Sequence, residues 1–348
     1  MTLRLPSDLM ARPAEEAARI LALSHLRQIG RARVRLDDPQ DLEALHDFRV
    51  GLRRLRSSLR AYRVQLKGSV SEKMEGSLRK LMRATNAGRD AEVQLTWLRK
   101  QGERMHPEEA QGLFWLIGRL EGRKSESLDS TTVEVSRQFG KAAAKFRRRL
   151  GTLKVEIEPG PGKRQPTFGQ VTAQAIRQHV ARLEKDLKQV RSSADIKQAH
   201  RARVAIKRLR YLLEPVARRH PRARDLVSRL KETQDQLGEL HDLHILSEEI
   251  AASRRTVSEG HPDHQSEPGL RSLERLAQEQ VAAAFEGFNS FWGGDRASRF
   301  LDRAAQIGRS LEEESPITAH EVRTLSLPEP PAAEAISSLA NLNHEHAV

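Results

Sequence analysis

The chain has 348 residues and a formal net charge of +13 at pH 7, and 46 of its 60 basic residues are arginine. Arginine holds phosphates and carboxylates through paired hydrogen bonds, so this composition indicates a phosphate-rich partner. The absence of cysteine excludes disulfide scaffolds, thiolate metal sites and cysteine nucleophiles. No apolar run is long enough to span a membrane, and no apolar signal segment is visible at the start, so we expect a cytoplasmic protein without a membrane partner.

Residues that favour helices fill most of the chain and runs of β-branched residues are scarce, so the predicted fold class is all-α. The first predicted helices cover residues 13–36, 39–66, 70–86, 89–104, 107–124 and 128–150. The later ones cover residues 168–191, 194–219, 221–237, 240–254, 269–288 and 296–312.

An internal repeat relates the two groups of helices when each residue is matched to the one 154 positions later. Residues 45–59 (LHDFRVGLRRLRSSL) then lie beside residues 199–213 (AHRARVAIKRLRYLL). The same offset places His25 beside His179, one helix earlier in each group. Because one offset holds across two helices and their connection, chance is a poor explanation. We therefore expect two similar halves related by a pseudo-two-fold axis, with matched residues converging on a shared surface.

The repeat sets the predicted domain organisation. One domain covers residues 1–312, with a first half over 13–150 and a second half over 168–312. Residues 151–167 between them contain three prolines and several glycines, which is typical of a linker. The tail, 313–348, is rich in proline and has no apolar stripe, so we expect it to be disordered.

Each repeated helix carries a packing stripe and a separate cationic stripe on a helical wheel. Acidic partners usually accompany such a stripe three or four residues away, but only Glu214 enters either arc. Stacked like charges repel, so two matched copies favour a bound anion over a solvated basic face. The cationic residues on the two arcs are Arg49, Arg53, Arg56, Arg60, Arg203, Lys207 and Arg210.

Four histidines at matched positions raise the question of a metal site. Their arginine neighbours repel cations, and the carboxylates nearby are limited to Asp47, Asp90 and Asp242. Histidines in this setting are better suited to donate hydrogen bonds to phosphate oxygens, so we predict no metal. Phosphate-loop, zinc-protease and serine-hydrolase motifs are missing, so we predict no catalytic residue and no cofactor. The four histidines are His25, His46, His179 and His200.

The segments HDFRVGLRRLRSSLR (46–60) and HRARVAIKRLRYLLE (200–214) resemble the two signature helices of the CHAD family, the conserved histidine α-helical domain. GRDAEV (88–93) and LGELHDL (237–243) resemble the family's second, weaker motif. The resemblance covers about 13–312 and implies two pseudo-symmetric helical-bundle halves around a central basic cavity or pore. It also implies inorganic polyphosphate as the ligand, and association with polyphosphate granules and their proteins in bacterial cells.

The resemblance also implies which residues face the ligand. The signature helices contribute their cationic arcs, together with Arg54 and Arg208, which match the motif but lie off the main arc. The second motif adds Arg89 and His241. The complete predicted polyphosphate-binding set is His25, His46, Arg49, Arg53, Arg54, Arg56, Arg60, Arg89, His179, His200, Arg203, Lys207, Arg208, Arg210 and His241.

Two other functions stay open at this point. The net positive charge permits nucleic-acid binding, although an aromatic content of 4% argues against a base-stacking platform. A metal-dependent enzyme acting on phosphate substrates would need Asp47, Asp90 and Asp242 to hold Mg²⁺. Each of these is explained more simply as orienting an arginine or a histidine.

If the histidines contribute charge, affinity for polyphosphate should rise from pH 8 to pH 6.

Overall fold

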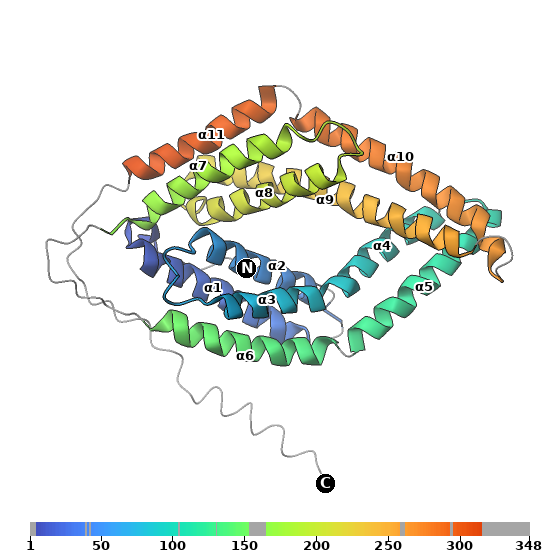
Figure 1. Ribbon diagram of the computed structural model, residues 1–348, viewed down its shortest axis with the longest axis horizontal. Helices are drawn as coiled ribbons and strands as arrows, with labels where there is room; N and C mark the ends of the chain where they lie inside the picture. The colour runs from blue at the N-terminus through green and yellow to red at the C-terminus, as the bar shows by residue number, and fades with distance from the viewer. Residues whose placement is uncertain are drawn as a thin grey trace, which may run out of the picture. The chain divides into compact units, whose positions relative to one another are not determined.

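Helical periodicity predicts the architecture of this chain, and α-helices account for most of the residues that its computed structural model describes (Figure 1). The described residues are 5–38, 40–41, 43–103, 105–129, 131–152, 165–257, 262–292 and 295–314, without the side chains of 86–89, 124–129 and 131–133. The predicted linker, 151–167, and the predicted tail, 313–348, lie for the most part outside these ranges. Residues 1–316 form one compact unit.

The first helices in chain order are α1 (Ala14–Arg35), α2 (Ala44–Ala61), α3 (Glu72–Ala84), α4 (Asn86–Gly102), α5 (Ala110–Asp129) and α6 (Thr131–Gly151). The later ones are α7 (Phe168–Leu187), α8 (Ile196–Val216), α9 (Pro221–Thr256), α10 (Glu267–Trp292) and α11 (Asp295–Glu313). Over the described ranges the backbone forms no β-strand apart from an isolated bridge between Pro13 and Thr167. The predicted all-α class is therefore confirmed. None of the helices in these ranges is long and apolar enough to cross a bilayer.

Local sequence explains where several helices begin. Ser71 caps α3 by accepting a hydrogen bond from the backbone nitrogen of Met74. Thr167 and Gln170 form a capping box at the start of α7, in which each side chain accepts from the other's backbone nitrogen. Pro221 occupies the first turn of α9, where its missing N–H group costs nothing.

One predicted break between helices is wrong. The sequence suggests separate helices over 221–237 and 240–254, but α9 runs through Gly238 without a break. Leu230, Leu237 and Leu240 continue its apolar stripe into the core, so packing overrides the low helix propensity of one glycine. At the matching place in the first half the chain does break, and Thr85 separates α3 from α4.

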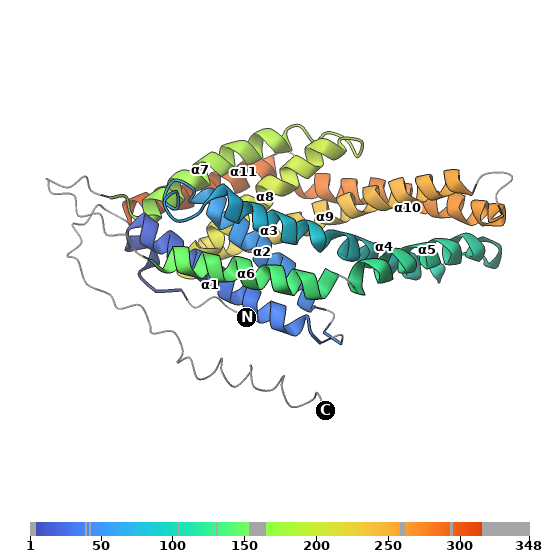
Figure 2. The same ribbon diagram turned by 60° about the horizontal axis from the view of Figure 1, so that its bottom comes forward.

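The main hydrophobic core joins helices from both halves of the chain. Helix α1 packs on α2 and α6, whereas α7 packs on α8 and α11, and α2 contacts α8 (Figure 2). Leu52 and Leu55 of α2 and Ile206 and Leu209 of α8 are fully buried in this core. The apolar stripes of the two signature helices therefore point inward, as the wheel predicts, and most of their cationic side chains lie at the edge of the core.

A second, smaller core lies where α4, α5 and α10 meet the C-terminal part of α9. Figure 2 shows these four helices running together away from the others. Gly112 of α5 and Gly269 of α10 bring the starts of two helices into backbone contact. A Cβ atom on Gly112 would lie 2.5 Å from the carbonyl oxygen of Ser266, and one on Gly269 would overlap the carbonyl oxygen of Glu109.

We predict that Gly112→Ala destabilises the protein by about 1–3 kcal/mol, because the added methyl group meets backbone that has no room to move. Gly118→Ala, in the same helix, is the matched control. Gly118 is exposed with open space around its Cβ position, so alanine there should stabilise the helix by up to about 1 kcal/mol. Thermal unfolding followed by circular dichroism measures both changes. Equal effects of the two substitutions would contradict the close packing of α5 against α10.

Candidate anion-binding site

The cationic stripes of α2 and α8 meet where these two helices contact each other. Lys207 of α8 is half-buried there. Burial, followed by the positive charges of Arg203 and Arg53, lowers the pKa of Lys207 to about 7, with smaller contributions from Arg210 and Arg208. We call Lys207 and these four arginines the Lys207 cluster.

Two cations of the Lys207 cluster have no acidic partner among the described residues. Within the described part of the chain, no carboxylate lies within ion-pair distance of Lys207 or Arg203. The Nε atom of Arg203 is buried and has no hydrogen-bond partner there either. Donors buried without acceptors are costly, and positive charges held together repel, so the cluster is stabilised by any anion that enters it.

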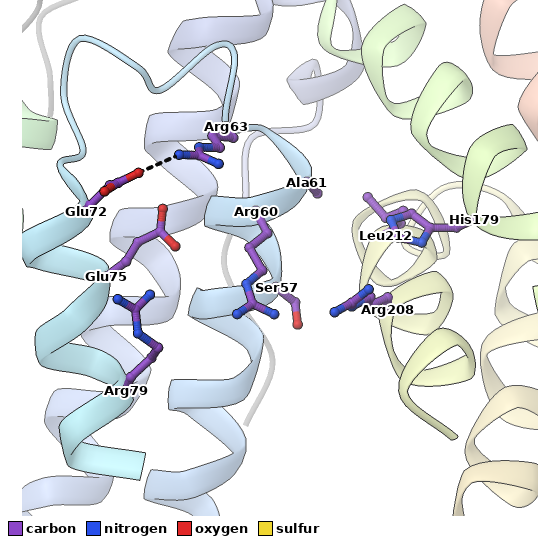
Figure 3. Close-up of a pocket in the computed structure, with 10 residues that line it drawn as sticks. All are labelled: Ser57, Arg60, Ala61, Arg63, Glu72, Glu75, Arg79, His179, Arg208 and Leu212. Carbon is purple, nitrogen blue, oxygen red and sulfur yellow. Dashed lines mark hydrogen bonds and ion pairs between the residues drawn. The ribbon is translucent and has the colours of Figure 1, made fainter. Parts of the chain in front are cut away.

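A pocket of about 590 Å³ opens between α2, α3, α7 and α8, next to this cluster (Figure 3). Arg60, Arg63 and Arg79 lie on one side of it, and His179 and Arg208 lie on the other. We call it the arginine pocket. Its remaining lining residues are Ser57, Ala61, Glu72, Glu75 and Leu212.

Positive charge dominates the arginine pocket even though two glutamates line it. Glu72 is paired with Arg63 at 3.0 Å, which leaves Glu75 to face the remaining cations. Burial and then the charge of Arg60 lower the pKa of Arg208. Burial and then Arg60 and Arg79 lower the pKa of the neighbouring Arg56, and Glu75 only partly offsets this. Burial contributes most to these lowered pKa values, and repulsion between the guanidinium groups adds to it.

Two of the predicted histidines stand at the other side of the Lys207 cluster. The rings of His200 on α8 and His241 on α9 lie 5.1 Å apart between centroids. Burial and then the charge of Arg203 lower the pKa of His241 to about 4 and also lower the pKa of His200. Both imidazoles are therefore neutral near pH 7. Lys207, with a pKa of about 7, is a group of this cluster that titrates between pH 8 and pH 6.

Two predicted residues are almost fully buried. His25 is only 4% exposed, its Nε2 atom lies 3.1 Å from the hydroxyl of Ser58, and burial lowers its pKa to about 3. Arg49 is only 7% exposed and donates from Nη1 to the hydroxyl of Thr85 at 2.9 Å. Both side chains pack α2 against its neighbours, and their predicted contact with phosphate stays a prediction.

Arg54 and Arg210 are engaged with Glu214. Arg54 on α2 donates to both carboxylate oxygens of Glu214 on α8, at 2.9 and 3.2 Å. Arg210 lies 3.2 Å from the same carboxylate and stacks over the ring of Tyr211 at 4.7 Å. The contact of Arg54 joins α2 to α8, so we assign Arg54 to holding these helices together. The contacts of Arg210 lie within α8.

Two further predicted ligand residues are His46 and Arg89. His46 is half-buried in the first turn of α2. The side chain of Arg89 lies outside the described residues. Asp47, one of the carboxylates considered for a metal, forms an ion pair with Arg35 at 2.5 Å. Across the described residues, no group of three histidine, aspartate or glutamate side chains is arranged to hold a metal ion.

Sequence reasoning missed the contribution of α3. Arg63, just after α2, and Arg79 of α3 line the arginine pocket, and the charge of Arg83 acts on Arg56. The spacing of Arg79 and Arg83 places both on one face of α3, a signal that was available but that α3 shares with many solvated helices. Only the packing of α3 beside α2 shows that Arg79 belongs to the same pocket as the arginines of α2.

Two solved structures share this fold. The crystal structure of the CHAD domain from the plant Ricinus communis is 22% identical in sequence, with a TM-score of 0.55 over 86% of this chain and 92% of that chain. PptA from Streptomyces chartreusis is 17% identical, with a TM-score of 0.57 over 81% of this chain and 100% of that chain. At these identities the likeness shows the fold alone. A comparison with curated proteins finds no match.

The sequence itself carries the family signal. Residues 20–251 match the family model of the CHAD domain. The match extends from α1 into α9, so it contains both signature helices and the helices that place them. It covers well over half of the chain, and the protein therefore belongs to the CHAD domain family.

Proposed function

We propose that this protein binds inorganic polyphosphate along the surface formed by the arginine pocket and the Lys207 cluster. Arg208 connects the two, because it lines the pocket and its charge also acts on Lys207. The observation that carries the proposal is that Arg60 and Arg208 face each other across the pocket. Both side chains are positively charged, and they come from different halves of the chain. A bridging phosphate would turn this repulsion into attraction.

Matched contacts support the proposed pseudo-two-fold relation between the halves. Under the 154-residue offset, Arg54 corresponds to Arg208 and Arg60 corresponds to Glu214. Arg54 contacts Glu214, and Arg60 acts on Arg208, so the two contacts exchange under the repeat. A two-fold axis between α2 and α8 requires this reciprocity. The charge of Arg54 acts on His25 just as the charge of Arg208 acts on His179, the matched residue of the other half.

The lining of the arginine pocket favours polyphosphate over nucleic acid. Polyphosphate carries about one negative charge per phosphate and has no bases to read or stack. No phenylalanine, tyrosine or tryptophan is among the described residues that line the pocket. Guanidinium groups supply paired donors for successive phosphates, whereas single-stranded nucleic acid is usually held by aromatic stacking as well. Nucleic-acid binding is therefore the second candidate, favoured only by the net charge.

We also propose that the protein acts as a binder and not as an enzyme. The ion pair of Asp47 with Arg35 supports this, because it commits a carboxylate that Mg²⁺-dependent chemistry would need. Binding to long chains would place the protein in the cytoplasm at polyphosphate granules, with granule-associated proteins as neighbours.

Replacing Arg60 and Arg208 together by glutamine tests the pocket. We expect affinity for long-chain polyphosphate to fall at least about tenfold, because two charge-assisted contacts are lost. Thermal stability should be unchanged or higher, because the replacements also remove a repulsion. Titration calorimetry at two salt concentrations measures the affinity, which should weaken steeply with salt.

Lys145 and Arg148, exposed on α6, provide the matched control for this pair. Replacing both by glutamine removes the same charge, so affinity should change less than about twofold if the site is local. Equal losses in the two double variants would mean that the protein binds through net charge alone.

Lys207 predicts how binding depends on pH. An anion in the cluster favours the ammonium form and so raises the pKa of Lys207 above its free value of about 7. Affinity should therefore rise as pH falls from 8 to 6 and level off below that. Lys207→Arg keeps the charge at every pH, so this variant should bind at pH 8 about as tightly as the parent binds at pH 6. His241→Gln should retain the pH dependence. If instead His241→Gln abolishes it, the histidines carry the effect.

A direct competition separates the two candidate ligands. The protein is saturated with labelled long-chain polyphosphate and challenged with duplex or single-stranded DNA of equal phosphate content. We expect DNA to displace polyphosphate only at large excess, because bases gain no stacking partners in the pocket. Displacement at equal phosphate content would favour the nucleic-acid function.

A further inference from the structure

Lys207 differs from the other cations of the site in its chemistry. A guanidinium group stays protonated in proteins, whereas an amine loses its proton readily when it is desolvated among positive charges. Arg203 lies four residues before Lys207 on α8 and Arg210 three residues after it, so all three share one face. Arg53 approaches from α2, and His200 and His241 stand beside the same group from α8 and α9.

This environment makes the side chain of Lys207 a nucleophile. With no carboxylate at ion-pair distance in the described residues to hold its proton, and with a pKa of about 7, about half of the Lys207 amine is neutral at pH 7. A lysine at its ordinary pKa near 10.4 has fewer than about one neutral amine in a thousand at that pH. Lys207 is half-buried, so part of its side chain is exposed to solvent.

The groups around this amine also select its reaction partner. Guanidinium groups that bind phosphate oxygens would hold the phosphate end of a small acyl phosphate, and its carbonyl carbon would then lie next to the lysine. The buried, unpartnered Nε atom of Arg203 provides a donor for that purpose. Holding a nucleophile and an electrophile together in this way converts an encounter in solution into a local reaction.

We propose that Lys207 is a site of acylation by acyl phosphates. The neutral amine attacks the carbonyl carbon, a C–N bond forms, and the C–O bond to the phosphate breaks. Inorganic phosphate leaves with the bonding electrons, and the amine proton passes to water. No oxidant, metal or further reactant is needed.

The modification would regulate the proposed function, and this second part of the inference rests on that function. Acylation turns a titratable cation into a neutral amide in the middle of the cluster. Polyphosphate affinity should then fall, and lose its pH dependence, as the cell's acyl phosphate concentration rises. Bound polyphosphate should protect Lys207, because it occupies the guanidinium groups that hold the reagent.

Acetyl phosphate is the probe. The full-length protein is incubated with it at pH 7, and acetylated lysines are quantified over time by mass spectrometry, with and without long-chain polyphosphate. Lys145, exposed on α6, is the internal control. We expect Lys207 to react at least about tenfold faster than Lys145, although it is less exposed. A parallel series uses acetic anhydride, which carries no phosphate, and the preference for Lys207 should be several-fold smaller there. Arg203→Gln should lower the preference more with acetyl phosphate than with acetic anhydride, because Arg203 lowers the pKa of Lys207 for both reagents but would hold only the phosphate.

Each outcome decides one claim. Lys207 reacting no faster than Lys145 with acetyl phosphate would overturn the proposed acylation, whatever the binding data show. Equal preference for Lys207 with both reagents would overturn the anchoring of the phosphate by arginine. Rapid acetylation of Lys207 in a protein that fails to bind polyphosphate by calorimetry would support the modification site and remove the proposed function instead.

Discussion

The contact between α2 and α8 is the constraint on which the rest of the structure depends. On one side of it, Arg54 and Glu214 bind each other at hydrogen-bond distance. On the other side, Arg60 and Arg208 face each other with like charge. Both arrangements follow from one difference between the halves, since Glu214 stands where the repeat would place a second arginine like Arg60. An acid at this single position clamps the helices on one side and leaves the other side open to an anion.

Magnitudes explain how the fold tolerates so much repulsion. Like charges stacked along a helix cost a few tenths of a kcal/mol per pair when they are solvated. Burying one leucine contributes about 1.5–3 kcal/mol, and α2 and α8 each bury several apolar side chains against the main core. The apolar stripes therefore fix the helices in place, and the cationic stripes have to accept the positions that result. The lowered pKa values of Lys207, Arg56 and Arg208 agree with this, because burial and neighbouring positive charges disfavour the charged form of each.

Much of this arrangement of α2 and α8 could be predicted from the sequence, because the repeat shows which helices and which helix faces correspond. The offset of 154 residues identifies the matched helices, and a helical wheel separates the apolar stripe from the cationic one. A wheel gives direction but not depth, however, so it does not distinguish Arg49, which is buried, from Arg53. It also ignores partners on other helices, which is why the pairing of Arg54 with Glu214 and the contribution of Arg79 become visible only in three dimensions. The missing break at Gly238 has a related reason, because the packing of nearby side chains decides whether a helix ends at a glycine.

Because α9 is uninterrupted, local unfolding should spread differently in the two halves of the chain. The first part of α9 contributes Leu230 and Leu237 to the main core, and its last turns contribute Leu246 and Ile250 to the second core. The first half of the chain divides the same task between α3 and α4, which meet at Thr85. Fraying that starts in the second core can therefore stop at Thr85 on one side, but along α9 it passes directly to His241. Exchange of backbone amide hydrogens would follow that difference, with α4 opening as a separate unit and α9 opening together with its contacts to the Lys207 cluster.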